Sequence, residues 1–573
     1  MKGEGKKKRT VKMIVVCYPV LLFYVTAFMT YNPFVRTDWL AQLLNILLLE
    51  AATMFLLAFC GSAVVALRIL TGTALLVSLL NSYVLLFRGS PLVPWDLWSI
   101  QTAWSVAGRF RYVPNMQQIV CTLLLLTMFA GAGWLKWRME RTEWKKRVVT
   151  GLTAIFVICG ITAAVQNEEL ASRLKLYPFL FTPTAMYERN GFCVTYLMDM
   201  QYLAIHRPEG YSVELAEQIL SDAAQMDTQE LTQRPTVIVM MDEAFSDPAV
   251  LGELQTDRDY MPFVHGLMQG SENTVSGYLS VSVKGGNTAN TEFEFLTGNT
   301  MAFLPAGSIP YQQYIRREVP SLASQFEGLG YETCALHPYR ASGWNRDKVY
   351  PLLGFSNFLS QEDFQGATGV RGYVDDASCV RKLMELYEKK EKNKPGFYFC
   401  VTMQNHSPYT DGYEALNGNI SVEGANNRAL EEYLTLLEAS DAAFEDLVDY
   451  FREQEEPVLL VFFGDHQPAD SVVAGIGQDP EQTGLRYEVP YVIWANYDIP
   501  EKTNVSTSAN YLAAQICNYG GIPTSDYQQF LLWLSEKYPV ISAQHTGEEA
   551  SKDIQEYQIL QYYFLFEKER GQK

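Results

Sequence analysis

The first third of the chain is dominated by apolar stretches long enough to cross a lipid bilayer, which takes about 20 residues of helix. The sequence predicts five membrane-spanning helices, at residues 12–31, 39–59, 62–87, 118–136 and 148–166. A cleaved signal peptide fits poorly, because the first apolar run is followed by four more rather than by a soluble domain. We therefore predict a transmembrane domain of five helices over residues 1–166.

From about residue 234 the pattern changes to short β-branched and aromatic runs separated by helical stretches. Such runs are typical of strands buried on both faces of a parallel sheet. Helices predicted at 374–391, 428–454 and 507–519 alternate with them, so the expected fold is α/β with a mostly parallel central sheet. We assign residues 167–233 to a juxtamembrane connector and residues 234–573 to an outer domain.

The net charge of the chain changes sign at the end of the predicted transmembrane domain, between residues 166 and 167. Residues 1–166 hold 17 Lys+Arg against 6 Asp+Glu, a net charge of +11, and residues 167–573 carry −30. An acidic surface repels phosphate backbones, so no nucleic-acid partner is expected. Basic residues at the N-terminus and between the fourth and fifth spans predict that both lie in the cytoplasm. An odd number of spans then places the outer domain outside the cell, in a multi-pass protein of the cell membrane.

Four apolar runs of the outer domain end in acids, amides or histidines. The runs and the residues that follow them are TVIVMM with Asp242-Glu243, TCAL with His337, GFYFCVTM with Gln404-Asn405-His406, and PVLLVFF with Gly464-Asp465-His466. Ligands of open α/β sheets bind outside the carboxyl ends of the strands, so these side chains should converge on one crevice. A satisfied core or surface histidine is the alternative for any one of them. Together they favour a metal-assisted phosphoryl site.

A glycine-containing turn supplies a candidate nucleophile. The segment VKGGNTANTEFEFLTG, residues 283–298, places two glycines before Asn287-Thr288, and a helical run is predicted from near Thr291. A helix N-terminus offers backbone N–H groups and a favourable dipole to an anion. The Thr288 hydroxyl is a candidate nucleophile if a metal lowers its pKa. Helix capping by Thr288 or Asn290 is the alternative, and this segment alone leaves both open.

Seven motifs in this order resemble the lipoteichoic acid synthase family, the membrane-bound phosphoglycerol transferases of the alkaline phosphatase/sulfatase superfamily. The motifs are PLVPWDL (91–97), MDEAFSD (241–247), GGNTANTEFEF (285–295), SGWNRDKVYPLLGF (342–355), MQNHSPY (403–409), FGDHQP (463–468) and VPYVIWAN (489–496). The resemblance covers nearly the whole chain. It implies a five-helix transmembrane domain followed by an extracellular sulfatase-like α/β catalytic domain.

The resemblance implies a metal site at the strand ends. The family pattern makes Glu243, Thr288, Asp465 and His466 the ligands of one divalent ion, with Thr288 as nucleophile. Carboxylates, an imidazole and an alkoxide suit Mn²⁺, with Mg²⁺ or Zn²⁺ as alternatives.

The same resemblance implies a substrate site. Trp344, Arg346 and His406 correspond to contacts with the substrate phosphate, Arg346 as a charged fork and His406 as general acid and base. Without the resemblance, Trp344 reads as a packing aromatic and Arg346 as a surface ion pair with Asp347. His337 corresponds to a contact with the glycerol group. No carboxylate stands beside it, which departs from the family pattern and leaves the head group open.

The implied function is transfer of glycerol phosphate from the phospholipid phosphatidylglycerol to a polymer or glycan acceptor, through a phospho-threonine intermediate at Thr288. A phosphoethanolamine transferase of the same superfamily is one alternative. A non-catalytic membrane protein that binds cell-wall polymer is another. Sulfate-ester hydrolysis is disfavoured, because residues 288–292, TANTE, lack the Pro and Arg of the sequence that is converted to formylglycine.

Overall fold

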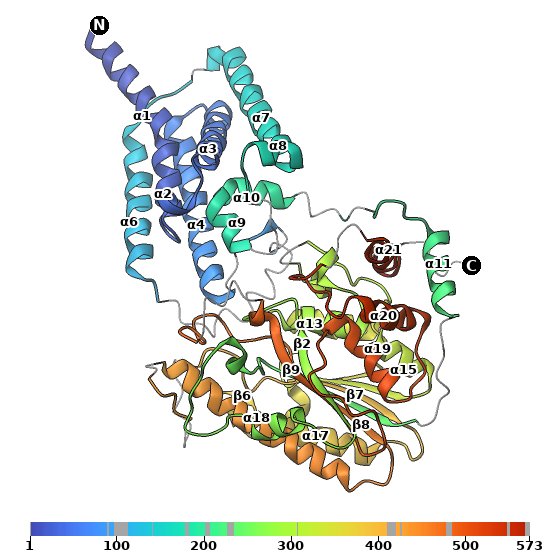
Figure 1. Cartoon of the computed structure of the whole chain (residues 1–573). Coiled ribbons are helices and arrows are strands. Elements are labelled where there is room, and N and C mark those ends of the chain that lie inside the picture. The colour runs from blue at the N-terminus through green and yellow to red at the C-terminus, as the bar shows by residue number, and fades with distance from the viewer. Residues whose placement is uncertain are drawn as a thin grey trace. The chain divides into compact units, whose positions relative to one another are not determined.

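The chain forms two compact units in the computed structural model (Figure 1). The first unit holds residues 1–205 and 305–307, and the second holds residues 206–304 and 308–573. The structure describes residues 2–88, 91–94, 96, 113–139, 141–177, 183–200, 205, 207–225, 234–305, 308–409, 420–424, 427–476, 484–546 and 551–567. The PLVPWDL motif therefore falls partly outside the described residues.

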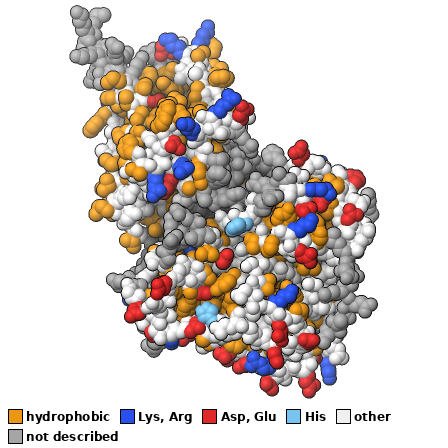
Figure 2. Space-filling model, in the orientation of Figure 1, with side chains coloured by type: hydrophobic (Ala, Val, Ile, Leu, Met, Phe, Trp, Pro, Cys, Tyr) orange, Lys and Arg blue, Asp and Glu red, His pale blue; other side chains and the backbone are white. Residues whose placement is uncertain are grey.

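The first unit is helical, and among its described residues four helices are long and apolar enough to cross a membrane. These stretches are Trp39–Cys60, Ala63–Leu86, Met116–Trp134 and Trp144–Gln166. Large apolar side chains lie exposed along them (Figure 2), as on helices that face lipid. The helices of this unit are α1 (Lys2–Ala27), α2 (Pro33–Arg36), α3 (Trp39–Cys60), α4 (Ala63–Arg88), α6 (Met116–Gly131), α7 (Trp144–Gln166), α8 (Glu168–Arg173), α9 (Pro183–Asn190) and α10 (Phe192–Asp199).

The four candidate spans agree with four of the five predicted ones. The first prediction, 12–31, falls on α1, whose apolar part is Met13–Ala27. That stretch is shorter than the roughly 20 residues that a crossing requires. The fifth span therefore stays a prediction, and so does the side of the membrane on which the second unit lies.

The second unit is built on an eight-stranded sheet in the order β10-β2-β9-β8-β1-β7-β3-β4. Five of its seven pairings are parallel, which confirms the predicted mostly parallel sheet, and both antiparallel pairings involve β9. A separate hairpin pairs β5 with β6. The strands are β1 (Thr236–Asp242), β2 (Thr274–Ser280), β3 (Glu332–Leu336), β4 (Asn357–Leu359), β5 (Gly369–Val370), β6 (Tyr373–Val374), β7 (Gly396–Val401), β8 (Val458–Gly464), β9 (Glu488–Ala495) and β10 (Thr507–Ser508).

Helices cover both faces of this sheet (Figure 1). Alternate residues of β1 enter two different apolar clusters, one shared with α13, α15 and α19 and the other with α12, α17 and α18. The predicted helices at 374–391, 428–454 and 507–519 are confirmed as α17, α18 and α19. The helices are α11 (Val213–Ala223), α12 (Pro262–Met268), α13 (Thr288–Thr297), α14 (Pro310–Gln313), α15 (Leu322–Gly328), α16 (Arg346–Leu352), α17 (Asp376–Lys389), α18 (Arg428–Arg452), α19 (Ala509–Tyr519), α20 (Asp526–Lys537) and α21 (Lys552–Phe566).

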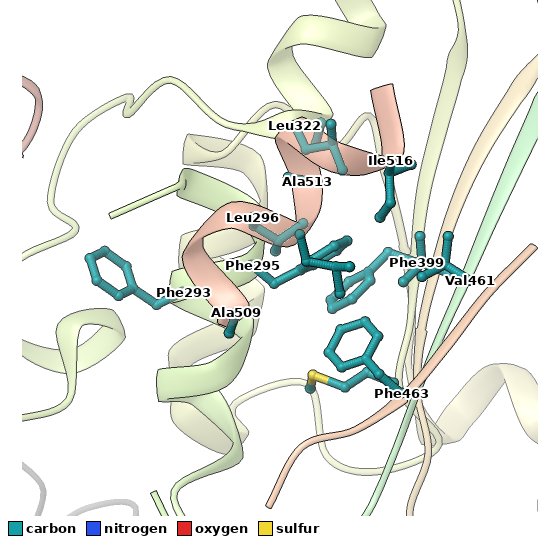
Figure 3. Packing of buried hydrophobic residues seen from close by; sticks show 14 of the residues in the cluster. Phe293, Phe295, Leu296, Leu322, Phe399, Val461, Phe463, Ala509, Ala513 and Ile516 are labelled. Carbon is teal, nitrogen blue, oxygen red and sulfur yellow. The ribbon is translucent and has the colours of Figure 1, made fainter. Parts of the chain in front are cut away.

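Aromatic packing fixes helix α13 on the sheet. Phe295 of α13 lies 5.6 Å from the ring of Phe399 on β7 and 5.1 Å from that of Phe463 on β8 (Figure 3). All three side chains are fully buried, and each such ring stabilises the fold by several kcal/mol, of the order of 3–5 for truncation to alanine. The N-terminus of α13 is thereby held beside the ends of β1 and β8.

The four apolar runs that end in polar residues correspond to strands β1, β3, β7 and β8. These strands are adjacent in the order β8-β1-β7-β3 and mutually parallel, so their carboxyl ends lie along one edge. Strands β1, β7 and β8 are buried over their whole length, as continuous apolar runs predict.

A charged histidine on α12 gives the second unit a pH-dependent interaction. The Nδ1 atom of His265 lies 2.9 Å from Asp259 Oδ1, and its Nε2 atom lies 3.7 Å from Asp247 Oδ2. Burial lowers the pKa of His265, but the interactions with the two aspartates outweigh it and raise that pKa to about 9. The stabilisation that protonated His265 contributes to the fold is therefore complete below pH 6.5 and is lost as pH rises through 9.

We expect His265→Gln to lower the free energy of unfolding by about 1 kcal/mol near pH 6 and by much less near pH 10. Urea unfolding of the intact protein at the two pH values measures this difference. His545→Gln, at an exposed histidine, is the matched control and should change stability little at either pH. An equal loss for His265→Gln at both pH values would contradict the charge assignment.

Candidate functional site

Three buried side chains meet at the carboxyl ends of β1 and β8. The ligand atoms of Glu243, Asp465 and His466 all lie within 4.8 Å of one another. The Nε2 atom of His466 is 3.3 Å from Asp465 Oδ2 and 3.8 Å from Glu243 Oε1. This group could hold a metal ion.

The hydrogen bonds of this group leave the metal-facing atoms without partners. The Nδ1 atom of His466 lies 3.0 Å from the Gln467 carbonyl, which can only accept, so Nδ1 carries the proton and Nε2 a lone pair. Asp465 Oδ1 accepts from the Ala244 N–H, whereas Asp465 Oδ2 and His466 Nε2 are buried with no hydrogen-bond partner. Buried unpaired acceptors are costly, and a divalent cation between them removes that cost. The residues present therefore fit a metal site.

Thr288 is the first residue of α13 and points at the same group. Its Oγ1 atom donates to Glu243 Oε2 over 3.4 Å. The capping alternative is wrong, because Asn287 is the N-cap residue, in the left-handed region at φ 69° and without a side-chain capping bond. Asn290 instead donates to the Ser308 carbonyl. The predicted helix start near Thr291 is three residues late.

Close backbone approaches hold these segments in register. A Cβ on Gly464 would lie 1.7 Å from the Phe245 carbonyl oxygen, so the turn after β1 rests directly on the end of β8. Thr291 Oγ1 donates to the Asp465 carbonyl at 2.7 Å, which joins the first turn of α13 to the same point. Three segments distant in sequence are thus fixed against one another by one close backbone approach and one side-chain hydrogen bond.

Acidic groups accumulate behind the ligands as well. Burial raises the pKa of Glu243 well above its usual range, and the neighbouring Asp465 carboxylate raises it further. Burial also raises the pKa of Asp242, as does Asp376, whose own pKa is raised by burial to about 6. Asn405 donates to Asp242 Oδ1 at 2.9 Å. Such a concentration of buried carboxyl groups requires protons or a cation to compensate it.

Arg346 is buried, and its partner differs from the one expected. It pairs with Glu292 of α13, donating from Nε at 3.0 Å and also from Nη2. Tyr350 donates to the other Glu292 oxygen at 2.7 Å. The predicted alternative, a surface ion pair with Asp347, is wrong. Because Glu292 accepts along the Nε/Nη2 edge, only the remaining edge of the guanidinium is directed elsewhere.

The segment before Arg346 has an unusual backbone. Trp344 and Asn345 both have positive φ, 54° and 60°, which non-glycine residues adopt at a cost of about 1–3 kcal/mol each. Trp344 is half-buried and packs against the cluster shared with α13, as the packing alternative predicts, and its contact with a substrate phosphate stays a prediction. Ala244, directly after Glu243, has φ 53°. Strain of this kind concentrates at functional sites.

Two further predicted histidines lie at the ends of β3 and β7. The Nδ1 atom of His337 lies 2.9 Å from the Val401 carbonyl and that of His406 lies 2.8 Å from the Ser407 carbonyl, so each ring presents Nε2 on its other side. Burial lowers the pKa of both, with Arg346 contributing at His337 and His466 at His406, where the pKa falls to about 4. Both rings are neutral near pH 7.

A family model described as Sulfatase matches residues 235–522, about half of the chain. A putative cyclic beta-1,2-glucan modification protein of Rhizobium meliloti (strain 1021) is 30% identical over 493 residues, which cover 81% of this chain and 75% of that protein. The chain belongs to the sulfatase family. Lipoteichoic acid synthase 1 of Bacillus subtilis is 24% identical over 36% of this chain and 32% of that protein. The superfamily implied by the motifs is therefore confirmed, whereas membership of the lipoteichoic acid synthase group stays a proposal.

Two solved structures share the fold of this chain. The phosphoglycerol transferase GacH of Streptococcus pyogenes superposes with a TM-score of 0.55 and 23% identity, covering 63% of this chain and 96% of that chain. The integral membrane protein EptA of Neisseria meningitidis, a lipooligosaccharide phosphoethanolamine transferase, gives 0.52 and 13%, covering 90% and 96%. At these identities the likeness shows the fold alone.

Two residues that support the site of this sulfatase-family chain were not predicted from the sequence. Glu292 follows Thr288 by one helical turn, so the helical period alone could have placed both on the same face of α13. Asp376 is the first residue of α17, and from the sequence alone its carboxylate has an ordinary explanation, a favourable interaction with the helix dipole. Nothing in the sequence indicates that Asp376 lies beside Asp242, since that contact depends on the packing of α17 against the sheet.

We expect Mn²⁺ to stabilise the wild-type protein against thermal unfolding, by about 2.7 kcal/mol at a hundredfold excess over the dissociation constant. His466→Ala should lose most of this shift, because it removes one of the buried ligand atoms. Asp498→Asn, at an exposed acid, is the matched control and should keep the shift. A full Mn²⁺ shift in His466→Ala would contradict the proposed ligand set, and no shift in the wild type would favour the non-catalytic alternative.

Proposed function

We propose that this chain is a membrane-bound, metal-dependent phosphotransferase that moves glycerol phosphate from phosphatidylglycerol to a polymer or glycan acceptor. The observation that carries the proposal is the position of Thr288, at the N-terminus of a helix with its hydroxyl directed at Glu243 beside the Asp465 and His466 ligand atoms. A hydroxyl in that position can attack a phosphodiester and form a phospho-threonine intermediate.

The site residues have separable roles in this scheme. A metal held by Glu243, Thr288, Asp465 and His466 would lower the pKa of the threonine hydroxyl and polarise the phosphoryl group. The guanidinium edge of Arg346 that does not bond to Glu292 would bind a phosphate oxygen. Because neutral His406 has a lone pair on Nε2, this atom can take the proton that the Thr288 hydroxyl releases and pass it to the leaving diacylglycerol oxygen. In the second step Nε2 takes the proton of the acceptor hydroxyl and returns it to Thr288.

The membrane helices and the relatives support a lipid donor and a glycan acceptor. A phospholipid cannot diffuse through water, so a site attached to membrane-spanning helices has direct access to it. One relative is named as a cyclic beta-1,2-glucan modification protein, and one structure of similar fold is a phosphoglycerol transferase bound to sn-glycerol-1-phosphate. We infer that the catalytic domain lies outside the cytoplasm, in accordance with the basic loops of the first unit.

Two alternative functions can be weighed against this proposal. Phosphoethanolamine transfer is the first alternative: EptA, which is named as a phosphoethanolamine transferase, shares the fold over 90% of the chain. The observation in favour of this alternative is that His337 lacks the adjacent carboxylate expected for glycerol recognition. A non-catalytic polymer-binding role is disfavoured, because Glu243, Thr288, Asp465 and His466 are all present and a binding module has no need of a nucleophile.

We expect Thr288→Ala to abolish transfer while the domain stays folded, because the core consists of apolar strands rather than of the site. The assay is release of diacylglycerol from labelled phospholipid, with circular dichroism to verify the fold. Asp465→Asn should lower the same rate by at least about two orders of magnitude, the scale for losing an electrostatic catalytic element. Thr300→Ala, at a buried threonine that bonds to Glu294, is the matched control. Full activity of Thr288→Ala would sink the covalent scheme.

The head group can be identified at the intermediate. We expect label from the head group of phosphatidylglycerol, and not of phosphatidylethanolamine, to remain on Thr288 after a brief incubation without acceptor. Peptide mass spectrometry locates the modified residue. If only label from phosphatidylethanolamine reached Thr288, the donor would be phosphatidylethanolamine and the nucleophile would still be Thr288.

A further inference from the structure

A short hairpin contacts the loop that carries His406, and neither belongs to the metal group. Strands β5 and β6 are joined by Arg371 and Gly372, which both have positive φ, 56° and 82°. A two-residue turn of this kind favours Asn, Asp or Gly at its first position, where this chain has a long charged side chain. The disfavoured residue indicates that the Arg371 side chain is required there.

The Arg371 guanidinium binds the backbone of the His406 loop. Its Nη2 atom donates to the His406 carbonyl at 2.9 Å and to the Pro408 carbonyl, and Nη1 donates to the Gln404 carbonyl at 3.4 Å. The Arg371 side chain is 1% exposed, and its Nε lies 3.4 Å from Glu432 Oε1 of α18. Arg371 thus connects both ends of the loop to a long helix of the core.

The second strand of the hairpin supports the imidazole itself. The hydroxyl of Tyr373 lies 3.2 Å from His406 Nδ1 and 3.4 Å from the Ser407 carbonyl, and the two rings lie 5.5 Å apart. These contacts lie on the Nδ1 side of the ring. Nε2 is therefore held facing the opposite direction, where it can exchange a proton with substrate.

We propose that the β5–β6 hairpin is a positioning device for His406, in which Arg371 fixes the loop backbone and Tyr373 orients the imidazole through its Nδ1 edge. The role of His406 in proton transfer rests on the proposed function. The contacts that define the device do not.

Tyr373→Phe tests the orienting hydroxyl, because the ring and its burial are kept. We expect the turnover number for donor cleavage to fall about tenfold, with KM changed less than twofold. In a His406→Ala background the same substitution should have no further effect, since the two residues act as one unit. Tyr387→Phe is the matched control, at a tyrosine of similar burial on α17, and should keep the full rate. A full rate in Tyr373→Phe, or an equal loss in the His406→Ala background, would refute the orienting role.

Arg371→Lys tests the backbone clamp by a measurement that does not need activity. A lysine keeps the charge but cannot reach three carbonyls, so we expect faster amide exchange over residues 403–409 and a turnover number lower by about a hundredfold. Arg381→Lys, at an exposed arginine of α17, should leave both unchanged. Unchanged exchange in Arg371→Lys would refute the clamp. If the wild type transfers no head group, the proposed function is wrong. The amide-exchange measurement still tests whether the hairpin holds the His406 loop.

Discussion

The second unit of this protein depends on one electrostatic constraint, a set of buried acceptors brought together without a positive partner of their own. Glu243, Asp465 and the lone pair of His466 converge within 4.8 Å, and Asp242 and Asp376 lie behind them. In a low-dielectric interior such a group is stable only with bound protons or a cation. The sheet order forces the arrangement, because β1 and β8 are adjacent and parallel and end at the same level.

The elements around these buried acceptors hold them in position. Backbone contact between Gly464 and Phe245 leaves no room for the turns to separate, and the packing of Phe295 fixes the helix that presents Thr288. Arg346, the one buried cation on α16, is matched by Glu292, so it adds little net charge to the site. The compensating positive charge must therefore come from bound protons or from a cation rather than from Arg346.

The parts of this structure that follow from local pattern were predictable, and the parts that follow from packing were not. Continuous apolar runs identified the strands β1, β3, β7 and β8, and their common direction brought the polar ends together. The partner of Arg346 could not be predicted, because Glu292 lies 54 residues earlier and meets it only through the fold. The apolar part of α1 is shorter than its predicted span, since hydropathy alone does not fix where a helix ends. The roles of the site residues themselves stay predictions.

Locating a bound metal ion is the most direct test of this site. Crystals of the protein soaked in Mn²⁺, measured at the manganese absorption edge, should give one anomalous peak in contact with Glu243, Asp465, His466 and the Thr288 hydroxyl. A peak elsewhere on the second unit, or none at a saturating concentration, would contradict the claim that these buried acceptors exist to hold a catalytic ion.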